Sequence, residues 1–88
     1  MVNGNCVIEC DGSIVYRLKD YGYHRIDGPA FENPDGYKAW WLYGKRHRLD
    51  GPAIEHADGS YSWYYHGKRI DCTTQEEFEH LLKLKAFW

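Results

Sequence analysis

The sequence predicts a mainly β (α+β) fold: an antiparallel meander of about six strands, arranged as three hairpins and followed by one C-terminal helix. Three observations support this prediction. Residues 24–40 and 47–63 repeat one another at an offset of 23 residues. In both copies, segments rich in ring-bearing residues flank an Asp-Gly pair, as in β-hairpins. Residues 73–87 carry apolar residues at helical spacing. We therefore expect one domain, 1–88, with hairpin repeats over 5–69 and a helix over 73–87.

The same residue recurs 23 places later at thirteen positions of the two copies, and ten of these pairs define the repeat. A degenerate first copy precedes these two, with Glu9 and the turn Asp11-Gly12. The repeats end after Arg69, where two residues of the pattern are missing. Such a pattern is typical of repeat proteins with atypical ends. The ten pairs are His24/His47, Asp27/Asp50, Gly28/Gly51, Pro29/Pro52, Glu32/Glu55, Asp35/Asp58, Gly36/Gly59, Trp40/Trp63, Gly44/Gly67 and Lys45/Lys68.

The predicted strands are 5–10, 13–19, 29–33, 37–43, 52–56 and 60–66. The Asp-Gly pairs at 35–36 and 58–59 predict hairpin turns, because Gly accepts the positive φ that such turns require and Asp tolerates it. The Gly-Lys pairs at 44–45 and 67–68 predict turns that join one hairpin to the next. Pro29 and Pro52 stand at strand starts, where a missing N–H does least harm.

The sequence marks where the terminal helix begins, which of its faces is apolar and where it ends. Thr73 with Glu76 and Thr74 with Glu77 are two overlapping capping boxes. We expect the helix to cover one face of the sheet, with Trp40 and Trp63 packed beneath it. The apolar positions of the helix are Phe78, Leu81 and Leu82, and Lys83 and Lys85 lie in its last turn. After this helix, Phe87 and Trp88 either pack into the core or are exposed and contact a partner.

The three cysteines favour reduced thiols in the cytosol over a disulfide framework. On a strand, Cys6 and Cys10 lie about 13 Å apart at ~3.3 Å per residue. That is too far for a disulfide, which needs Cα atoms within about 7 Å, and too far for a shared zinc ion. We therefore expect Cys6 and Cys10 to act as small buried hydrophobic residues. The sequence leaves the position of Cys72 open.

No pattern indicates catalysis, a cofactor or a metal. Equivalent residues of successive hairpins, such as His24 and His47, lie two strands or roughly 9.5 Å apart, too far to share an ion. We expect each histidine to bond its own loop. Glu9, Glu32 and Glu55 form a similar row, which we interpret as a solvated stripe. No serine or cysteine has a base at a motif spacing, and no glycine-rich loop leads into a helix. We therefore predict a protein that is not an enzyme.

The distribution of charge along the chain says more about a binding surface than the net charge does. The net charge of −2 and a pI near 6.2 argue against general attraction to nucleic acid or anionic membrane. Alternate turns of a meander lie at opposite ends, so Asp11, Asp35 and Asp58 should gather at one end. The other end then gathers Arg25, Lys45, Arg46, Arg48, Lys68 and Arg69. These charges either keep the edges soluble or face an acidic or phosphate-bearing partner.

Strand alternation gives a second candidate surface. If the helix covers one face, Tyr37, Trp41, Tyr43 and Tyr64 are left on the other. Exposed Tyr and Trp are typical of binding hot spots, although a homodimer interface or plain exposure remains an alternative. The candidate partner-binding residues are Tyr37, Trp41, Tyr43, Tyr64, Arg46, Arg48, Lys68 and Arg69.

The run Trp41-Leu42-Tyr43-Gly44-Lys45-Arg46-His47 and the period of 23 residues resemble MORN repeats. The fuller pattern over residues 5–69 is similar to the MORN-variant repeats of many phage and giant-virus proteins and of some bacterial antitoxins. Arg25 and Arg48 stand where the standard motif has Gly after the His, which argues against the lipid binding attributed to MORN proteins. The resemblance implies binding without catalysis.

The predicted function is that of a small phage-type inhibitor or antitoxin-like protein. It would block a bacterial protein, such as a toxin or a nuclease-bearing defence complex targeted by counter-defence proteins of the anti-CRISPR kind. The alternatives are a nucleic-acid-binding protein that uses the basic end with the aromatics, and a structural or self-assembling repeat protein. We expect no membrane partner and a cytoplasmic location, in the host cytoplasm for a phage-encoded chain.

Overall fold

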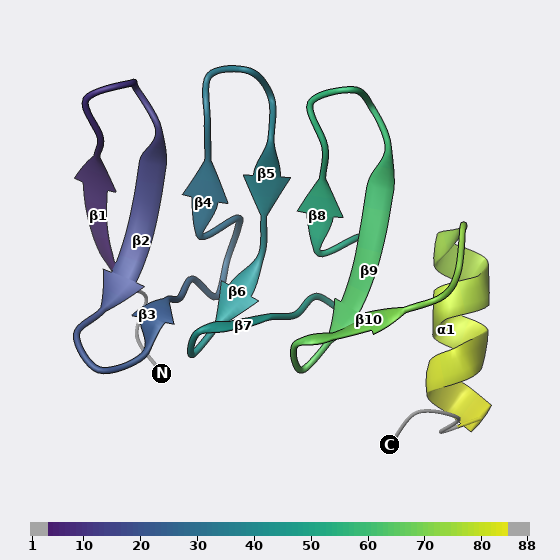
Figure 1. Ribbon diagram of the computed structural model, residues 1–88. Helices are drawn as coiled ribbons and strands as arrows, with labels where there is room; N and C mark the ends of the chain where they lie inside the picture. Colours follow the sequence, from purple (N-terminus) through teal and green to yellow (C-terminus); the bar gives the residue numbers. More distant parts are fainter. Residues whose placement is uncertain (1–3, 85–88) are drawn as a thin grey trace.

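The computed structural model describes residues 4–84, which form ten strands and one helix (Figure 1). The molecule is thin, with principal extents of 41 × 30 × 17 Å. The elements are β1 (Asn5–Ile8), β2 (Ile14–Leu18), β3 (Gly22–Tyr23), β4 (Phe31–Glu32), β5 (Lys38–Ala39), β6 (Trp41–Leu42), β7 (Lys45–Arg46), β8 (Ile54–Glu55), β9 (Tyr61–Tyr65), β10 (Lys68–Ile70) and α1 (Gln75–Leu84).

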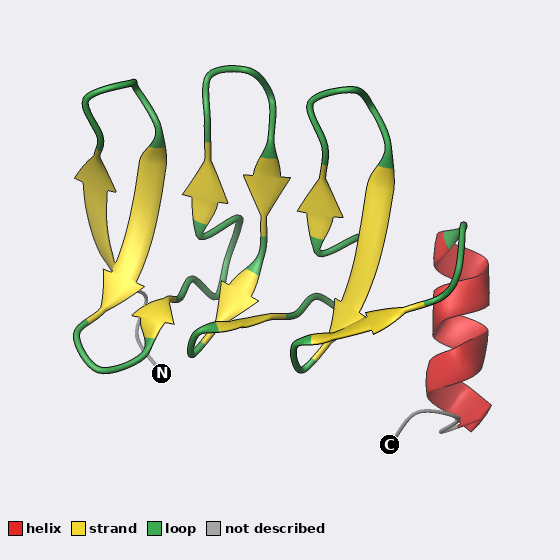
Figure 2. Cartoon of the chain, in the orientation of Figure 1, coloured by secondary structure: helices red, strands yellow, loops and turns green. Residues whose placement is uncertain are grey.

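The main sheet has the order β1-β2-β4-β5-β8-β9-β10, and every neighbouring pair is antiparallel. β3 pairs with β2, and β6 and β7 form a separate two-stranded sheet. Three hairpins, β1–β2, β4–β5 and β8–β9, stand side by side with their Asp-Gly turns at the same end (Figure 2). The fold is therefore mainly β, antiparallel, with one C-terminal helix.

The number of strands differs from the six predicted, because the Gly-Lys turns also form hairpins. Tyr43 and Gly44 have φ of 48° and 80°, and His66 and Gly67 have φ of 50° and 86°. Two successive left-handed residues reverse the chain at once, so the residues that follow pair back. Trp41 thus pairs with Arg46 across one turn, and the β9–β10 hairpin closes across the other.

The predicted strand 37–43 is also interrupted. The Trp40 N–H donates to the carbonyl of Ala53 at 2.7 Å, towards the next hairpin, whereas Trp41 pairs with β7. The strand therefore divides into β5 and β6. The 23-residue spacing persists in the backbone contacts, since the Gly44 N–H bonds the Tyr23 carbonyl and the Gly67 N–H bonds the Arg46 carbonyl.

The core is narrow and has two parts. Between the hairpins the buried apolar residues are small or aliphatic, namely Val15, Ala30, Ala39, Ala53 and Ile54, and the His24 side chain is also fully buried. At the C-terminal end, three larger buried side chains form a cluster. Trp63, Ile70 and Phe78 make this cluster, and Tyr65, Cys72, Leu81 and Leu82 pack against it. The face of α1 that carries Phe78, Leu81 and Leu82 is the one that the helical spacing predicts.

α1 begins with the second of the two predicted caps. The hydroxyl of Thr74 accepts a hydrogen bond from the Glu77 N–H at 3.2 Å. The Glu77 carboxylate accepts from the N–H and the hydroxyl of Thr73, and these bonds lower the pKa of Glu77. Within the described residues the helix runs from Gln75 to Leu84, so it begins two residues later than predicted. Lys85, Phe87 and Trp88 lie outside the described residues.

Two expectations about burial are wrong. Trp63 packs beneath α1, and its indole N–H donates to Gln75 Oε1 at 2.8 Å. Trp40 does not lie there; it is half-buried against the Arg48 guanidinium of the next loop. Cys6 and Cys10 are exposed rather than buried, because Cys6 lies on the edge strand β1, which pairs with β2 alone, and Cys10 lies in the turn that follows it.

Candidate partner-binding surface

The loops that follow His24 and His47 are built alike around an arginine. Arg25 Nε donates to Asp27 and Arg48 Nε donates to Asp50, both at 2.9 Å. Each guanidinium also donates to the carbonyl of the proline four residues on, at 3.3 and 3.2 Å. Arg48 additionally bonds Glu55 at 3.3 Å. The hydrogen bond from Arg48 holds the pKa of Asp50 below its usual range.

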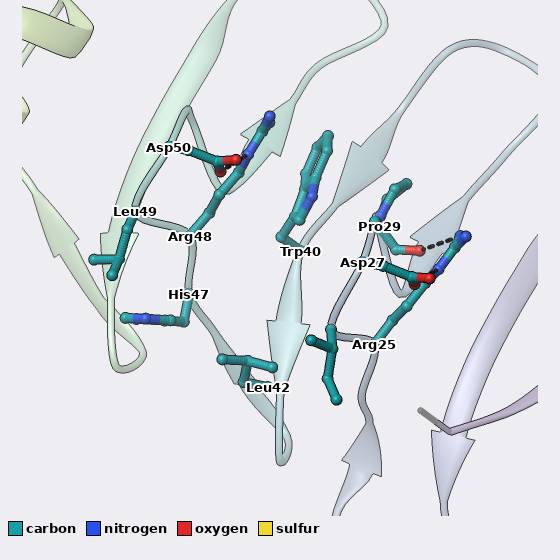
Figure 3. A pocket seen from close by; sticks show the side chains of 11 residues that line it. Arg25, Asp27, Pro29, Trp40, Leu42, His47, Arg48, Leu49 and Asp50 are labelled. Carbon is teal, nitrogen blue, oxygen red and sulfur yellow. Dashed lines mark hydrogen bonds and ion pairs between the residues drawn. The ribbon is translucent and has the colours of Figure 1, made fainter. Parts of the chain in front are cut away.

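Each of these arginines covers an aromatic ring. The Arg25 guanidinium lies 4.2 Å from the centre of the Tyr16 ring, and that of Arg48 lies 3.9 Å from the Trp40 ring. A groove of about 510 Å³ runs between the two loops, and Trp40 stands within it (Figure 3). Since carboxylates neutralise both guanidinium groups, Arg25 and Arg48 add no net positive charge to the basic end predicted from the sequence.

The last hairpin lacks this loop, and the helix takes its place. Asp71 stands 23 residues after Arg48, so no arginine is available to cover Trp63. Gln75 of α1 bonds the Trp63 indole, and its amide donates to the Leu49 carbonyl at 3.0 Å. The helix thereby closes the end of the array and joins it to the preceding loop.

The two repeated histidines fasten one hairpin to the next. Nδ1 of His24 accepts the Tyr43 N–H, and Nδ1 of His47 accepts the His66 N–H, both at 3.0 Å. The rings of His47 and His66 stack with centres 4.4 Å apart. The prediction that each histidine bonds its own loop missed this contact, which crosses to the following left-handed turn. An accepting Nδ1 carries no proton, so the bond requires that nitrogen to be unprotonated.

We expect the protein to lose stability in mild acid through His47. Burial, and secondarily the nearby His66, lower the pKa of His47 from its ordinary 6.5. The unfolded chain then binds more protons than the folded one, so the free energy of unfolding falls as the pH drops below about 6.5 and levels off below the folded pKa. Urea unfolding at a series of pH values measures the slope. His47→Gln should show a shallower slope than the unchanged protein, and an equal slope would contradict this assignment.

A stack of rings and guanidinium groups connects the β6–β7 sheet to β9 of the main sheet. Arg46 on β7 lies between Trp41 on β6 and Tyr64 on β9, with its guanidinium carbon 4.9 and 5.3 Å from the two ring centres. We call these three residues the Arg46 stack. All three are half-buried. The prediction that Trp41 and Tyr64 share one face is therefore confirmed.

The stack continues towards the N-terminal hairpin. The Tyr23 and Trp41 rings have centres 5.2 Å apart, and the Arg17 guanidinium lies 5.2 Å from the Tyr23 ring. Arg17 and Tyr23 are opposite one another in the β2–β3 pairing, as Trp41 and Arg46 are in β6–β7. Arg17 and Tyr23 were not among the predicted residues, because the degenerate first copy of the repeat is out of register with the other two. The recurring pair of a ring and an arginine across a short turn could have revealed them.

The other four candidate residues lie at three different positions on the molecule. Arg69 is opposite Tyr64 in the β9–β10 pairing, and Lys68 is opposite Tyr65; both basic side chains are exposed. Tyr37 packs near the Asp-Gly turns, with ring centres 5.7 Å from Phe31 and 5.9 Å from His56. Tyr43 lies in the turn at the opposite end, against His24 and Tyr21. Tyr37 is nevertheless connected to Trp41 by successive ring contacts through Phe31 and Tyr23.

The row of Glu9, Glu32 and Glu55 does not bring two carboxylates together, and two of the three are bonded to arginines. Glu9 accepts from Arg17 and Glu55 accepts from Arg48, each at 3.3 Å. Among residues 4–84, no group of three His, Cys, Asp or Glu side chains is placed to hold a metal ion. The same part of the chain contains no helix long and apolar enough to cross a membrane. Comparisons with family models, curated proteins and solved structures found no match.

Proposed function

We propose that the chain is a small, non-enzymatic module that binds another protein through the Arg46 stack. The observation that carries this proposal is the stack itself: two large rings and a guanidinium, half-buried and fixed against one another on short paired strands. Trp, Tyr and Arg are the residues most enriched at energetic hot spots of protein interfaces. Because the stack is fixed before binding, little side-chain entropy is lost when a partner covers it.

The nature of the partner follows from the likeness of residues 5–69 to MORN-variant repeats. That likeness rests on the motif residues and directs the search to bacterial proteins, such as toxins or nuclease-bearing defence complexes. In this role the chain would block its target by surface contact, as an inhibitor or antitoxin does. It would act in the bacterial cytoplasm and would need no cofactor.

Binding of single-stranded nucleic acid is the second candidate, and one observation favours it. Lys45, Arg46, Lys68 and Arg69 lie beside exposed and half-buried rings, as in sites where bases stack and phosphates are neutralised. The net charge of −2 opposes it. A salt titration separates the two candidates, because phosphate-driven binding weakens steeply with salt.

A third candidate function is self-assembly, and the observation that favours it is the unpaired edge of strand β1. Val7 and Ile8 are 47% and 71% exposed on a strand that pairs on one side only. Such edges can pair with another chain. Sedimentation at several concentrations tests this directly, since a self-assembling protein gains mass as its concentration rises.

Replacing both Trp41 and Tyr64 with alanine is expected to abolish partner capture while leaving the sheet folded. Each hot-spot ring typically contributes about 2 kcal/mol or more, so the double variant should lose roughly a thousandfold in affinity. The measurement compares proteins captured from bacterial lysate by the unchanged chain and by the variant, with circular dichroism to check the fold.

The matched control is Tyr61→Ala. Tyr61 lies on the same strand as Tyr64, is 55% exposed and packs beside Trp63 rather than Arg46. The proposed function requires a protein that the Tyr61 variant retains and the double variant loses. If the folded double variant captures the same proteins at full strength, the stack is not the interface.

A further inference from the structure

The Arg46 guanidinium lies against two rings and has no anionic partner among the residues that the structure describes. The two rings fix its position, and Trp41 is also its partner in the β6–β7 pairing. Across residues 4–84, no carboxylate or carbonyl accepts a hydrogen bond from it. Its Nε is buried and has no acceptor in that part of the chain.

The other arginines that cover rings differ from Arg46 in this respect. Arg17 is paired with Glu9, Arg25 with Asp27, and Arg48 with both Asp50 and Glu55. Each of those four contacts neutralises the guanidinium within the chain. Arg46 therefore retains its charge and its terminal donors for a group that comes from outside.

The surroundings of Arg46 attract negative charge. Residues 41–47 and 61–70, which form the paired strands on either side of it, contain no Asp or Glu. They contain Lys45, Lys68 and Arg69, all exposed. The neighbouring rings lower the local exposure to water, which strengthens a charge-assisted hydrogen bond at this place.

We infer that Arg46 is the receptor for an aspartate or glutamate side chain on an acidic segment of the protein partner. The inference rests on the proposed function and specifies which chemical group the stack binds. A planar guanidinium presents paired donors that match the two oxygens of a carboxylate. The exposed lysines and Arg69 form a basic rim that steers an acidic segment towards it.

A carboxylate on a protein fits better than a phosphate backbone. Single-stranded nucleic acid needs a basic groove that tracks several phosphates, with rings free to stack on bases. Here one face of the Trp41 ring and one face of the Tyr64 ring are already covered by Arg46.

The test uses the full chain and three probes: acetylated hexaglutamate peptide, inorganic phosphate and oligothymidine. Nitrogen–proton NMR of the arginine side chains reports on Arg46 directly, and indole fluorescence reports on the Trp residues. We expect hexaglutamate to shift the Arg46 Nε–H signal in a saturable way. Arg46→Gln and Arg46→Lys should each weaken peptide binding about tenfold, because both remove the planar fork.

Arg25→Gln is the matched control, since Arg25 also covers a ring but is already paired with Asp27. It should leave hexaglutamate binding unchanged. The inference is overturned if hexaglutamate leaves the Arg46 signal unmoved, if Arg46→Lys binds the peptide as well as the unchanged protein, or if oligothymidine binds more tightly with a steep dependence on salt.

The result also separates the two proposals. If the alanine variant of Trp41 and Tyr64 loses a captured protein but hexaglutamate does not contact Arg46, the interface is real and its partner group is not a carboxylate. If hexaglutamate binds at Arg46 but the alanine variant retains its partners, the anion receptor exists apart from the interface. The signal of Arg46 itself is readable in the unchanged protein, so poor folding of a variant does not decide the matter.

Discussion

Replacing Phe78 with alanine is expected to unfold the protein or leave it barely stable. Phe78 is fully buried, and it forms one cluster with Trp63 and Ile70. Deleting a buried phenylalanine side chain costs about 3–5 kcal/mol, because its transfer energy is lost and a cavity remains. A domain of this size is stabilised by only about 5–10 kcal/mol. The loss therefore approaches the whole stability of the fold.

Urea unfolding followed by circular dichroism measures this effect. The control is Leu84→Ala on the same helix, where the side chain is 61% exposed, and that change should cost less than about 0.5 kcal/mol. Truncation after Asp71 removes Phe78, Leu81 and Leu82 together and should have a larger effect than Phe78→Ala. A soluble fragment of residues 1–71 that melts cooperatively would show that the hairpins bury their own core without the helix.

The overall fold could be predicted because its determinants are periodic. Asp-Gly pairs marked the turns at one end, and the spacing of Phe78, Leu81 and Leu82 marked the buried face of the helix. The extra strands could not be predicted from residue type. Tyr43 and His66 adopt positive φ although neither is glycine or asparagine, and each is held there by the Nδ1 bond of the preceding histidine. That contact depends on how neighbouring hairpins meet, which no local pattern encodes.

The candidate surface was predictable in part for the same reason. Equal positions in successive units lie on one face, so Trp41 and Tyr64 could be grouped from their spacing alone. The roles of the arginines depend instead on side-chain direction. Arg46 and Arg48 are two residues apart, yet one lies between rings on the open face and the other folds back onto Asp50 and Trp40. A count of basic residues at one end of the sheet cannot separate them.

Replacing Gly44 with alanine is expected to destabilise the fold by several kcal/mol. Gly44 has a φ of 80°, and its N–H donates to the Tyr23 carbonyl at 2.9 Å, so the turn approaches the preceding loop closely. A Cβ at this position would collide with the carbonyl oxygen of Tyr21. The backbone strain costs roughly 1–3 kcal/mol, and the overpacking adds a similar amount.

Gly67 provides a matched control for this clash. It occupies the equivalent turn, has a φ of 86°, and donates to the Arg46 carbonyl at 2.8 Å. A Cβ there would meet only the Lys45 side chain, at an ordinary contact distance of 3.5 Å. Gly67→Ala should therefore show the strain alone, and Gly44→Ala should be less stable than Gly67→Ala by about 1–3 kcal/mol in urea unfolding. Equal losses in the two variants would mean that the loop around Tyr21 yields without cost, and that the close approach of Gly44 to it does not hold the first two hairpins together.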